Sequence, residues 1–251
     1  MPRMPKHFFF DMDNTLTRSK SPIAPEHEHI LVELSGRADV IIVSGSSEEN
    51  IWSRLTEAST GRYYSLTQNG NRAYDKDRTL IWEHLLNQRQ KDAVRRFVTL
   101  ARVHTPTIVP DENDLLEDRG CQMAFSFISQ HADINLKEKF DPDFAKRRKV
   151  LADLHEEVEK LANEYDLEIT IGGTTNLDIY IKGMNKGYNV RQLVERMSWK
   201  FDECVYVGDA IFPGGNDETV IGIIPTHPVK DYHETYDFIA DMLGMPRSSY
   251  T

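Results

Sequence analysis

The chain has 251 residues, of which 39% are hydrophobic and 28% charged, a composition typical of an ordinary globular protein with one large or two modest domains. Its formal net charge of −10 argues against a nucleic-acid partner, because phosphate contacts require clustered lysine and arginine. No apolar run approaches the roughly 20 residues of a membrane-spanning helix, and no secretory signal is recognisable before the first apolar run. We therefore expect a cytoplasmic protein that has no membrane partner and whose two cysteines are buried free thiols.

Strand and helix patterns alternate over the first 85 residues. Continuous apolar runs at residues 7–10, 40–43 and 63–66 are typical of strands buried on both faces of a parallel sheet. Amphipathic helical patterns lie between them, at residues 25–36 and 47–58. This order of elements predicts a doubly wound, Rossmann-like α/β sheet.

The middle of the chain follows a different pattern, in which helices separate pairs of strands. The expected elements are a hairpin at residues 71–82, helices at 87–103 and 143–165, and strands at 114–118, 122–129, 168–171 and 177–181. Paired strands with helices between them predict an α+β unit on an antiparallel sheet.

The alternation of helix and strand returns at Lys186. The expected elements are a helix to about residue 197, strands at 204–207 and 221–224, and a helix at 232–243. The complete order predicts a discontinuous α/β core at residues 1–85 and 184–251, interrupted by a cap domain at residues 86–183.

Two aspartates, Asp11 and Asp13, directly follow the first predicted strand. The carboxyl ends of the strands form the ligand crevice of an open α/β sheet, so both carboxylates are expected there. One carboxylate can attack phosphorus while the other transfers a proton, because a single group cannot hold both protonation states at once. A turn or capping cluster at a strand end is the structural alternative for this pair taken alone.

Two further carboxylates, Asp209 and Asp217, follow the buried strand at residues 204–207. Such hard oxygen ligands suit Mg²⁺, which binds a few carboxylates together with waters and substrate phosphate. A cation here would offset the repulsion between Asp11, Asp209 and an incoming phosphate. The pattern therefore predicts magnesium-dependent phosphoryl transfer through an aspartyl-phosphate on Asp11.

Ser44 and Lys186 complete the predicted phosphate site. Ser44 follows the second strand and can donate its hydroxyl to a phosphoryl oxygen, while Lys186 can place a positive charge beside it. Each is weak evidence alone, since a serine after a strand is usually a helix cap and a lysine is usually solvated. Their placement after successive strands makes the combination specific.

This set of motifs resembles the haloacid dehalogenase (HAD) superfamily of phosphotransferases, whose four motifs are matched in order. The matching residues are Asp11/Asp13, Ser44, Lys186 and Asp209/Asp217. The insert between the second and third motifs is similar to the large α/β cap of the type IIB subclass. Within that subclass the chain most resembles the eukaryotic-type phosphomannomutases, with signature-like stretches from Thr170 to Asp178 and from Gly208 to Asp217.

The resemblance implies a role for each residue of the core site. Asp11 would be the nucleophile and Asp13 the general acid/base, while Ser44 and Lys186 would hold the phosphate. The implied Mg²⁺ ligands are Asp11, the Asp13 carbonyl group and Asp209, with Asn216 and Asp217 lining the metal site.

The resemblance also implies contacts from the cap to a phosphorylated sugar. Arg119, Asn176 and Asp178 would face the substrate. Lys137 and Lys20 stand where arginines of the family contribute to the grip on phosphate, and Gln130 stands where a further arginine is expected. Relatives of this type also suggest a homodimer formed through the cap.

These departures from the family pattern favour hydrolysis. Lysine keeps the charge of arginine but loses its bidentate fork, and glutamine loses the charge as well. A mutase must hold a bisphosphate intermediate during turnover, so a weaker grip favours loss of the phosphoryl group to water. We therefore predict a sugar-phosphate phosphatase, with a phosphomannomutase that interconverts hexose 1-phosphate and 6-phosphate as the alternative. An inactive sugar-phosphate-binding protein is a third hypothesis, which predicts an eroded motif residue where none is found.

Overall fold

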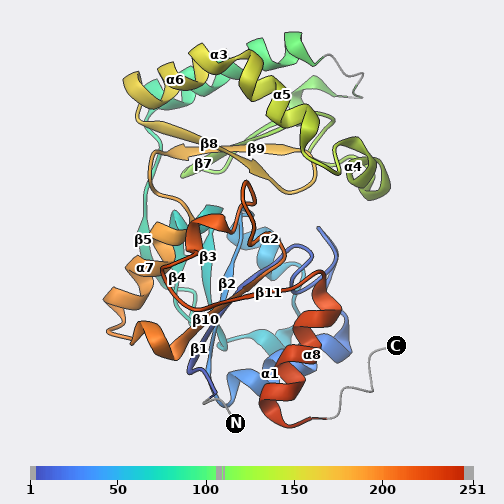
Figure 1. Cartoon of the computed structure of the whole chain (residues 1–251), viewed down its shortest axis with the longest axis vertical. Coiled ribbons are helices and arrows are strands. Elements are labelled where there is room, and N and C mark those ends of the chain that lie inside the picture. The colour runs from blue at the N-terminus through green and yellow to red at the C-terminus, as the bar shows by residue number, and fades with distance from the viewer. Residues whose placement is uncertain (1–3, 106–108, 110, 246–251) are drawn as a thin grey trace. The chain divides into compact units, whose positions relative to one another are not determined.

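A computed structural model of the chain describes residues 4–105, 109 and 111–245. The chain forms two compact units, each with its own sheet (Figure 1). The first unit comprises the residues up to Glu83 and from Asn185 onwards, and the second is His84–Met184. The prediction set the two connections at residues 85–86 and 183–184. Among the described residues, no helix is both long enough and apolar enough to cross a membrane.

The first unit is built on a seven-stranded sheet in the order β11-β10-β1-β2-β3-β4-β5. The strands from β11 to β3 run parallel, and β4 and β5 add an antiparallel edge. Their bounds are β1 (His7–Asp11), β2 (Asp39–Val43), β3 (Tyr63–Thr67), β4 (Arg72–Tyr74), β5 (Leu80–Glu83), β10 (Cys204–Gly208) and β11 (Thr226–Pro228). This sheet confirms the predicted α/β core.

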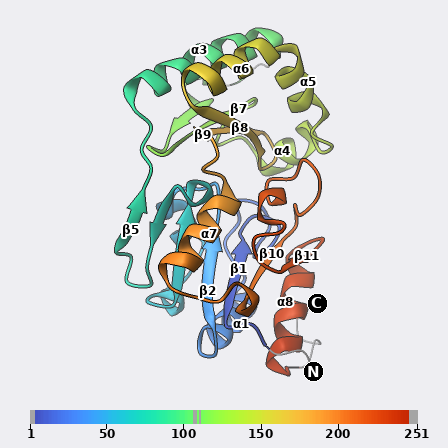
Figure 2. The same cartoon turned by 60° about the vertical axis from the view of Figure 1, so that its left-hand side comes forward.

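Helices cover both faces of this sheet, which explains why β1 is apolar without interruption. Phe8 and Phe10 pack into one hydrophobic cluster with residues of α1 and α8, whereas Phe9 packs into another with residues of α7. Figures 1 and 2 show α1 and α8 together on one side of the sheet and α7 on the other. The helices of this unit are α1 (Pro25–Ser35), α2 (Glu48–Trp52), α7 (Lys186–Arg196) and α8 (Tyr232–Leu243), with short 3₁₀ turns η1 (Glu57–Ser59), η2 (Gln68–Gly70), η4 (Phe201–Glu203) and η5 (Glu218–Val220).

The strand predicted at residues 221–224 is a turn in the structure, so that prediction was wrong. Gly222 has a φ of +81°, a left-handed conformation that interrupts an extended chain. Of this apolar run, Ile224 is buried and packs with Val220 into the cluster on the α7 side of the sheet, whereas Ile221 is 52% exposed. The edge strand begins only at Thr226, which pairs with Tyr206 of β10.

The second unit is an antiparallel four-stranded sheet in the order β6-β7-β9-β8, with helices packed on it. Alternate residues of the strands, among them Phe125 and Ile179, share a hydrophobic cluster with α3, α5 and α6. This arrangement confirms the predicted α+β insert. Its elements are α3 (Gln88–His104), η3 (Glu112–Asp114), β6 (Leu116–Asp118), β7 (Gln122–Ser126), α4 (Ile134–Phe140), α5 (Ala145–Asp153), α6 (His155–Glu164), β8 (Leu167–Gly172) and β9 (Asn176–Ile181).

The single helix predicted for residues 143–165 is divided at Leu154 into α5 and α6. Leu154 has a φ of −107° and a ψ of 26°, outside the usual α-helical range. Nδ1 of His155 lies 3.2 Å from the carbonyl oxygen of Ala152, which an unbroken helix would pair with the amide four residues later. A side chain that competes for a helix carbonyl in this way is a known cause of kinks.

A buried ion pair fixes the turn between β8 and β9. The Arg147 and Asp141 side chains are both 0% exposed, and Arg147 Nε donates to Asp141 Oδ2 at 2.7 Å. The Nη1 group of Arg147 donates to the carbonyl oxygens of Gly172 and Gly173 at 2.9 Å and of Asn176 at 3.2 Å. Arg147 therefore ties α5 to the turn that precedes two of the predicted sugar-binding residues.

Replacing Arg147 with methionine is expected to lower the free energy of unfolding by about 3–5 kcal/mol, because Asp141 would remain as an uncompensated buried charge. Urea unfolding followed by circular dichroism measures this loss. The exposed neighbour Arg148 provides the control, since Arg148→Met should change stability by no more than about 0.5 kcal/mol. Similar losses in the two variants would contradict a structural role for the pair.

Candidate active site

The predicted core residues gather at one edge of the parallel sheet. Asp11 ends β1, Ser44 follows the last residue of β2, and Asp209 follows the last residue of β10. The register brings these ends level, because Asp11 pairs with Val43 of β2 while the residue before it pairs with Val207 of β10. The fold therefore brings together motifs that lie far apart in the sequence.

A buried lysine lies at the centre of this group. Lys186 Nζ is 2.6 Å from Asp11 Oδ1 and 2.7 Å from Asp217 Oδ1, and all three side chains are buried. The hydroxyl of Tyr206 donates to Asp217 Oδ1 at 2.6 Å. The cation thus holds the nucleophile candidate and a metal-site candidate in fixed positions.

Gly187 explains how α7 can bring the lysine so close. A Cβ atom at this position would lie 1.9 Å from the carbonyl oxygen of Thr219, so no larger residue fits without a shift of the backbone. The Gly187 amide donates to the Thr219 hydroxyl at 3.1 Å. The first turn of α7 therefore packs directly on η5, next to Asp217.

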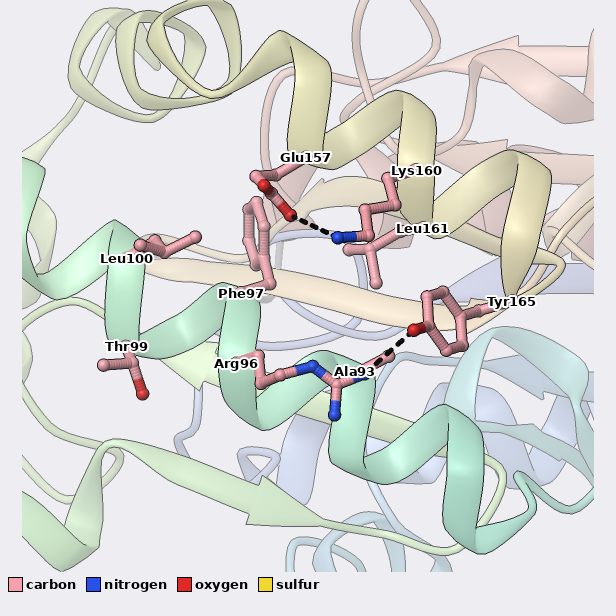
Figure 3. Close-up of a pocket in the computed structure, with 9 residues that line it drawn as sticks. All are labelled: Ala93, Arg96, Phe97, Thr99, Leu100, Glu157, Lys160, Leu161 and Tyr165. Atoms are coloured by element: carbon pink, nitrogen blue, oxygen red, sulfur yellow. Dashed lines mark hydrogen bonds and ion pairs between the residues drawn. The ribbon is translucent and has the colours of Figure 1, made fainter.

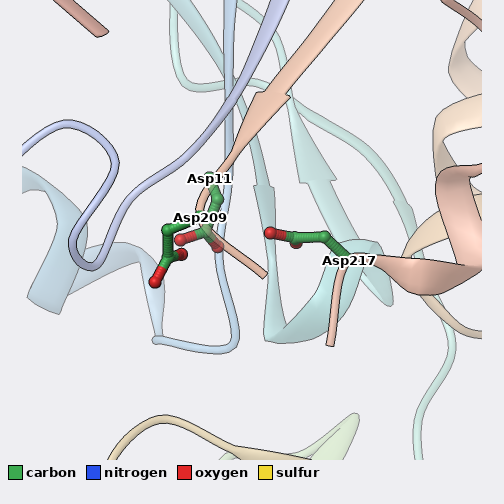
Figure 4. A group of neighbouring side chains, drawn as sticks. All are labelled: Asp11, Asp209 and Asp217. Atoms are coloured by element: carbon green, nitrogen blue, oxygen red, sulfur yellow. The ribbon is translucent and has the colours of Figure 1, made fainter. Parts of the chain in front are cut away.

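Three carboxylates could hold a metal ion in the first unit. Asp11, Asp209 and Asp217 each offer an oxygen, and these oxygens lie within 4.8 Å of one another. Figure 4 shows the Asp217 side chain extending toward those of Asp11 and Asp209. Lys186 offsets only one of their three negative charges, so a divalent cation fits both the charge and the hard oxygen ligands of the cluster.

The ionisation of the cluster supports the same conclusion. Burial, together with the charges of Asp217 and Asp209, raises the pKa of the Asp11 carboxyl, and Lys186 opposes this effect. Burial, followed by the charge of Asp217, raises the pKa of Asp209 to about 6. Burial alone would lower the pKa of Lys186, but the charges of Asp11 and Asp217 outweigh it and raise that pKa. Carboxylates with raised pKa values gain from a cation that stabilises their charged form.

Two residues that the prediction did not single out orient Asp209. The Thr15 hydroxyl donates to Asp209 Oδ1 at 3.3 Å and accepts the Asp209 amide at 3.0 Å. Asn14 Nδ2 donates to Asp209 Oδ2 at 3.4 Å, and its φ of 62° lets the loop after β1 turn back toward β10. Both residues lie between Asp13 and Thr17, so their proximity to the motif was the available signal.

Asp13 does not share the carboxylate cluster, although it stands two residues from Asp11. Its Oδ1 accepts hydrogen bonds from the backbone amide of Lys20 at 2.8 Å and from Arg54 Nη1 at 2.9 Å. Burial by itself would raise the pKa of Asp13, but the charge and hydrogen bond of Arg54 and the amide of Lys20 lower it. The prediction missed Arg54, and no local motif marks it.

Three further predicted residues of the first unit lie outside the carboxylate cluster. Ser44 is buried, and its Oγ accepts the amide of Ser46 at 3.1 Å. Asn216 is half-buried beside Asp217. The side chain of Lys20 is exposed, and its backbone φ of 56° is left-handed.

In the second unit, two of the predicted sugar-binding residues lie on β9 and a third, Arg119, directly follows β6. Asn176 and Asp178 alternate with the core-facing residues of β9, and Asp178 pairs with Ala124 on one side and Thr170 on the other. Arg119 Nη2 bonds to Glu117 Oε2 at 2.6 Å, and the arginine side chain is 7% exposed. Asn176 and Asp178 are thus polar positions on a strand whose alternate residues, Leu177 and Ile179, fill the core.

Lys137 and Gln130 are packed inside the second unit. The ammonium of Lys137 donates to the backbone carbonyl of Gln130, and the lysine is buried. The amide of Gln130 donates to the carbonyl oxygens of Ala124 at 2.8 Å and Leu115 at 3.3 Å. Its side-chain oxygen accepts from Asn176 Nδ2 at 3.2 Å. A role for Lys137 in substrate binding remains a prediction.

A groove between α3 and α6 has a different character (Figure 3). Apolar side chains such as Phe97 and Leu161 line it, and four of its polar side chains form two pairs. Arg96 bonds to the Tyr165 hydroxyl at 3.1 Å, and Lys160 lies 4.0 Å from a neighbouring glutamate. It contains no group of converging carboxylates, so we place the active site at the sheet edge of the first unit.

Comparison with known proteins decides the family. Residues 27–242 match the model of the eukaryotic phosphomannomutase family. The chain belongs to this family. It is 26% identical over 246 residues to a phosphomannomutase of Drosophila melanogaster, covering 94% of each chain. It is 25% identical over 228 residues to a phosphomannomutase of Spinacia oleracea, covering 87% of this chain and 90% of the relative.

Solved structures agree on the HAD fold. The C-terminal domain of a trehalose-6-phosphate phosphatase from C. albicans has a TM-score of 0.69 at 16% identity, covering 97% of this chain and 93% of that domain. A haloacid dehalogenase-like hydrolase from Bacteroides thetaiotaomicron has a TM-score of 0.60 at 16% identity, covering 88% and 86%. Together with the family match, this likeness of fold identifies the chain as an enzyme of the HAD superfamily, as its motifs predicted.

Membership of the phosphomannomutase family overturns the prediction that hydrolysis is the main activity. That prediction rested largely on Gln130 as the replacement of a phosphate-gripping arginine. In the structure Gln130 is only 6% exposed and its side chain is bonded within the second unit. A missing charge at one packed position does not decide whether water or a sugar hydroxyl accepts the phosphoryl group, because either acceptor would attack the same predicted aspartyl-phosphate.

Proposed function

We propose that the chain is a magnesium-dependent phosphomannomutase, which moves a phosphoryl group between the 1- and 6-positions of a hexose through an aspartyl-phosphate on Asp11. The observation that carries this proposal is the contact of Lys186 with both Asp11 and Asp217, in a chain of this family. It combines a fixed nucleophile with a positive charge at the place where phosphate would arrive.

Each residue of the core site has a role in the proposed reaction. The Asp11 carboxylate attacks phosphorus, and Asp13 transfers the proton of the sugar oxygen. Ser44 and Lys186 bind the phosphoryl oxygens. Mg²⁺ would be held by Asp11, the Asp13 carbonyl group and Asp209, with Asn216 and Asp217 lining the site. When bound, it would offset the repulsion between the carboxylates and the phosphate.

The substrate would be a phosphorylated hexose bound with help from the second unit. We propose Arg119, Asn176 and Asp178 as its sugar-phosphate contacts, with Lys137 and Lys20 as weaker candidates. A homodimer formed through the cap and a cytoplasmic location are further parts of the proposal.

Conversion of mannose 1-phosphate to mannose 6-phosphate, measured beside the release of free phosphate, tests this proposal. We expect conversion to exceed phosphate release, to require a hexose bisphosphate activator and to stop when EDTA removes the metal. Adding Mg²⁺ back should restore it. Phosphate release without isomerisation, with no response to the bisphosphate, would refute the mutase assignment.

A further inference from the structure

Arg54 is a buried cation beside the proposed acid/base, and none of the roles given above uses it. Its side chain is 8% exposed, whereas arginine is rarely buried in proteins unless it is paired. Nη1 donates to Asp13 Oδ1 at 2.9 Å, and Nη2 lies 3.5 Å from the hydroxyl of Ser46. The guanidinium group therefore connects the loop that follows β1 with the loop that follows β2.

The backbone of Arg54 is held independently of its side chain. Its carbonyl oxygen accepts the amide of Ile23 at 2.9 Å, and its own amide donates to the carbonyl of Ile51 at 3.2 Å. Ile23 and Ile51 are both buried in the hydrophobic cluster that contains Phe8. Attachment to this core restricts the movement of Arg54 relative to Asp13.

The hydrogen bonds to the Asp13 carboxylate distinguish its two oxygens. The amide of Lys20 and Nη1 of Arg54 both donate to Oδ1, at 2.8 and 2.9 Å. A carboxylate oxygen has two lone pairs, so these two donors occupy Oδ1. The Asp13 side chain is 25% exposed, which leaves room for a substrate oxygen to approach it. Oδ2 is then the oxygen available for proton exchange.

We propose that Arg54 is a positioning residue, which holds the Asp13 carboxylate so that Oδ2 exchanges the proton with the sugar oxygen. This inference rests on the proposed function. When a sugar hydroxyl attacks the phosphoenzyme, the bond between phosphorus and the Asp11 oxygen breaks, the bond to the sugar oxygen forms, and the hydroxyl proton moves to Oδ2. In the other half-reaction Asp11 attacks phosphorus, and Oδ2 returns the proton to the sugar oxygen that leaves.

Two substitutions of Arg54 and two phosphate donors test the proposal. Arg54→Met removes both hydrogen bonds, whereas Arg54→Lys can still donate one to Oδ1. Mannose 1-phosphate needs a proton on its leaving oxygen, but p-nitrophenyl phosphate releases a phenolate that leaves without one. The measurements are kcat and KM for the sugar phosphate and the initial burst of nitrophenolate, which reports phosphorylation of Asp11.

We expect Arg54→Met to lower kcat for the sugar phosphate by about 100-fold, the effect of a catalytic group misplaced by about 1 Å, with little change in KM. The kcat of Arg54→Lys should be about tenfold higher than that of Arg54→Met, since lysine keeps one hydrogen-bond donor to Oδ1. The nitrophenolate burst should be nearly unchanged in both variants. The control is Arg37→Met, just before β2, where the exposed arginine donates to the carbonyl oxygen of Leu243 at 3.3 Å.

If Arg54→Met lowered the rates with both phosphate donors equally, Arg54 would be a structural residue. If it raised KM for the sugar phosphate and left kcat unchanged, Arg54 would be a substrate-binding residue. Either result would overturn the proposal. In an Asp13→Asn background, Arg54→Met should cause no further loss, because residues that act through one another are not additive. If the wild-type enzyme does not isomerise mannose 1-phosphate, the proposed function fails, but phosphorylation of Asp11 by the two donors still measures the role of Arg54.

Discussion

Replacing Asp11 with asparagine is expected to lower kcat by at least about 10⁴-fold, because the amide cannot form the aspartyl-phosphate. The loss of activity should apply to every phosphate donor, including p-nitrophenyl phosphate. Attack by Asp11 on phosphorus is the first step with all of them, whatever the leaving group or the final acceptor. Isomerisation and the nitrophenolate burst both measure it. Mass spectrometry should detect a phosphorylated intermediate in the wild-type enzyme and none in the variant.

The same substitution should leave the fold intact. Asparagine has nearly the same shape as the aspartate that it replaces, and Lys186 would keep its 2.7 Å contact with Asp217. Removing one of three clustered negative charges also reduces repulsion, so the melting temperature without metal should not fall. Asp202→Asn, at an exposed position in η4, serves as the control and should retain full activity. Turnover by Asp11→Asn at more than about 1% of the wild-type rate would remove Asp11 as the nucleophile.

The core of the site could be predicted from sequence because topology determines it. Once β1, β2 and β10 are recognised as parallel buried strands, the residues after them must meet at one edge of the sheet. Asp11, Ser44 and Asp209 follow from that rule alone. Lys186 follows only when the insert is recognised, since about 140 residues separate it from Ser44 along the chain.

The rest of the site depends on contacts that have no local signal. Arg54 reaches Asp13 across 41 positions of sequence, and nothing in its own neighbourhood distinguishes it from a solvated arginine. The wrong prediction of hydrolysis has a similar origin. The sequence shows that Gln130 stands where an arginine is expected, but it does not show that the Gln130 side-chain amide donates to the carbonyl of Ala124. The false strand at residues 221–224 shows that an apolar run need not be a buried strand, since Ile221 is 52% exposed and Gly222 has a left-handed φ.

Replacing Lys186 with methionine is expected to lower both activity and stability, because the methionine preserves volume and removes the cation. Loss of a positive charge beside the transferring phosphoryl group should lower kcat by about 10²–10³-fold. Three carboxylates would remain near one another without compensation. By analogy with other broken buried ion pairs, the free energy of unfolding without metal should fall by about 3–5 kcal/mol at neutral pH. Urea unfolding measures the stability, and Lys200→Met, at an exposed position, is the control.

The stability loss in Lys186→Met should depend on pH and on metal in a defined direction. A carboxyl whose pKa is raised by folding stabilises the protein while it is protonated, and that contribution disappears as pH rises through its folded pKa. The pKa of Asp209 rises from a reference value of 3.8 to about 6 in the folded protein with Lys186 present, and the variant has less opposing charge. The difference in the free energy of unfolding between the wild-type protein and Lys186→Met should therefore be smallest near pH 4 and grow as the pH rises through 6.

Mg²⁺ should reduce this difference at neutral pH, because it replaces the missing positive charge. A difference independent of both pH and Mg²⁺ would show that Lys186 contributes through packing, and would contradict the electrostatic role proposed for it.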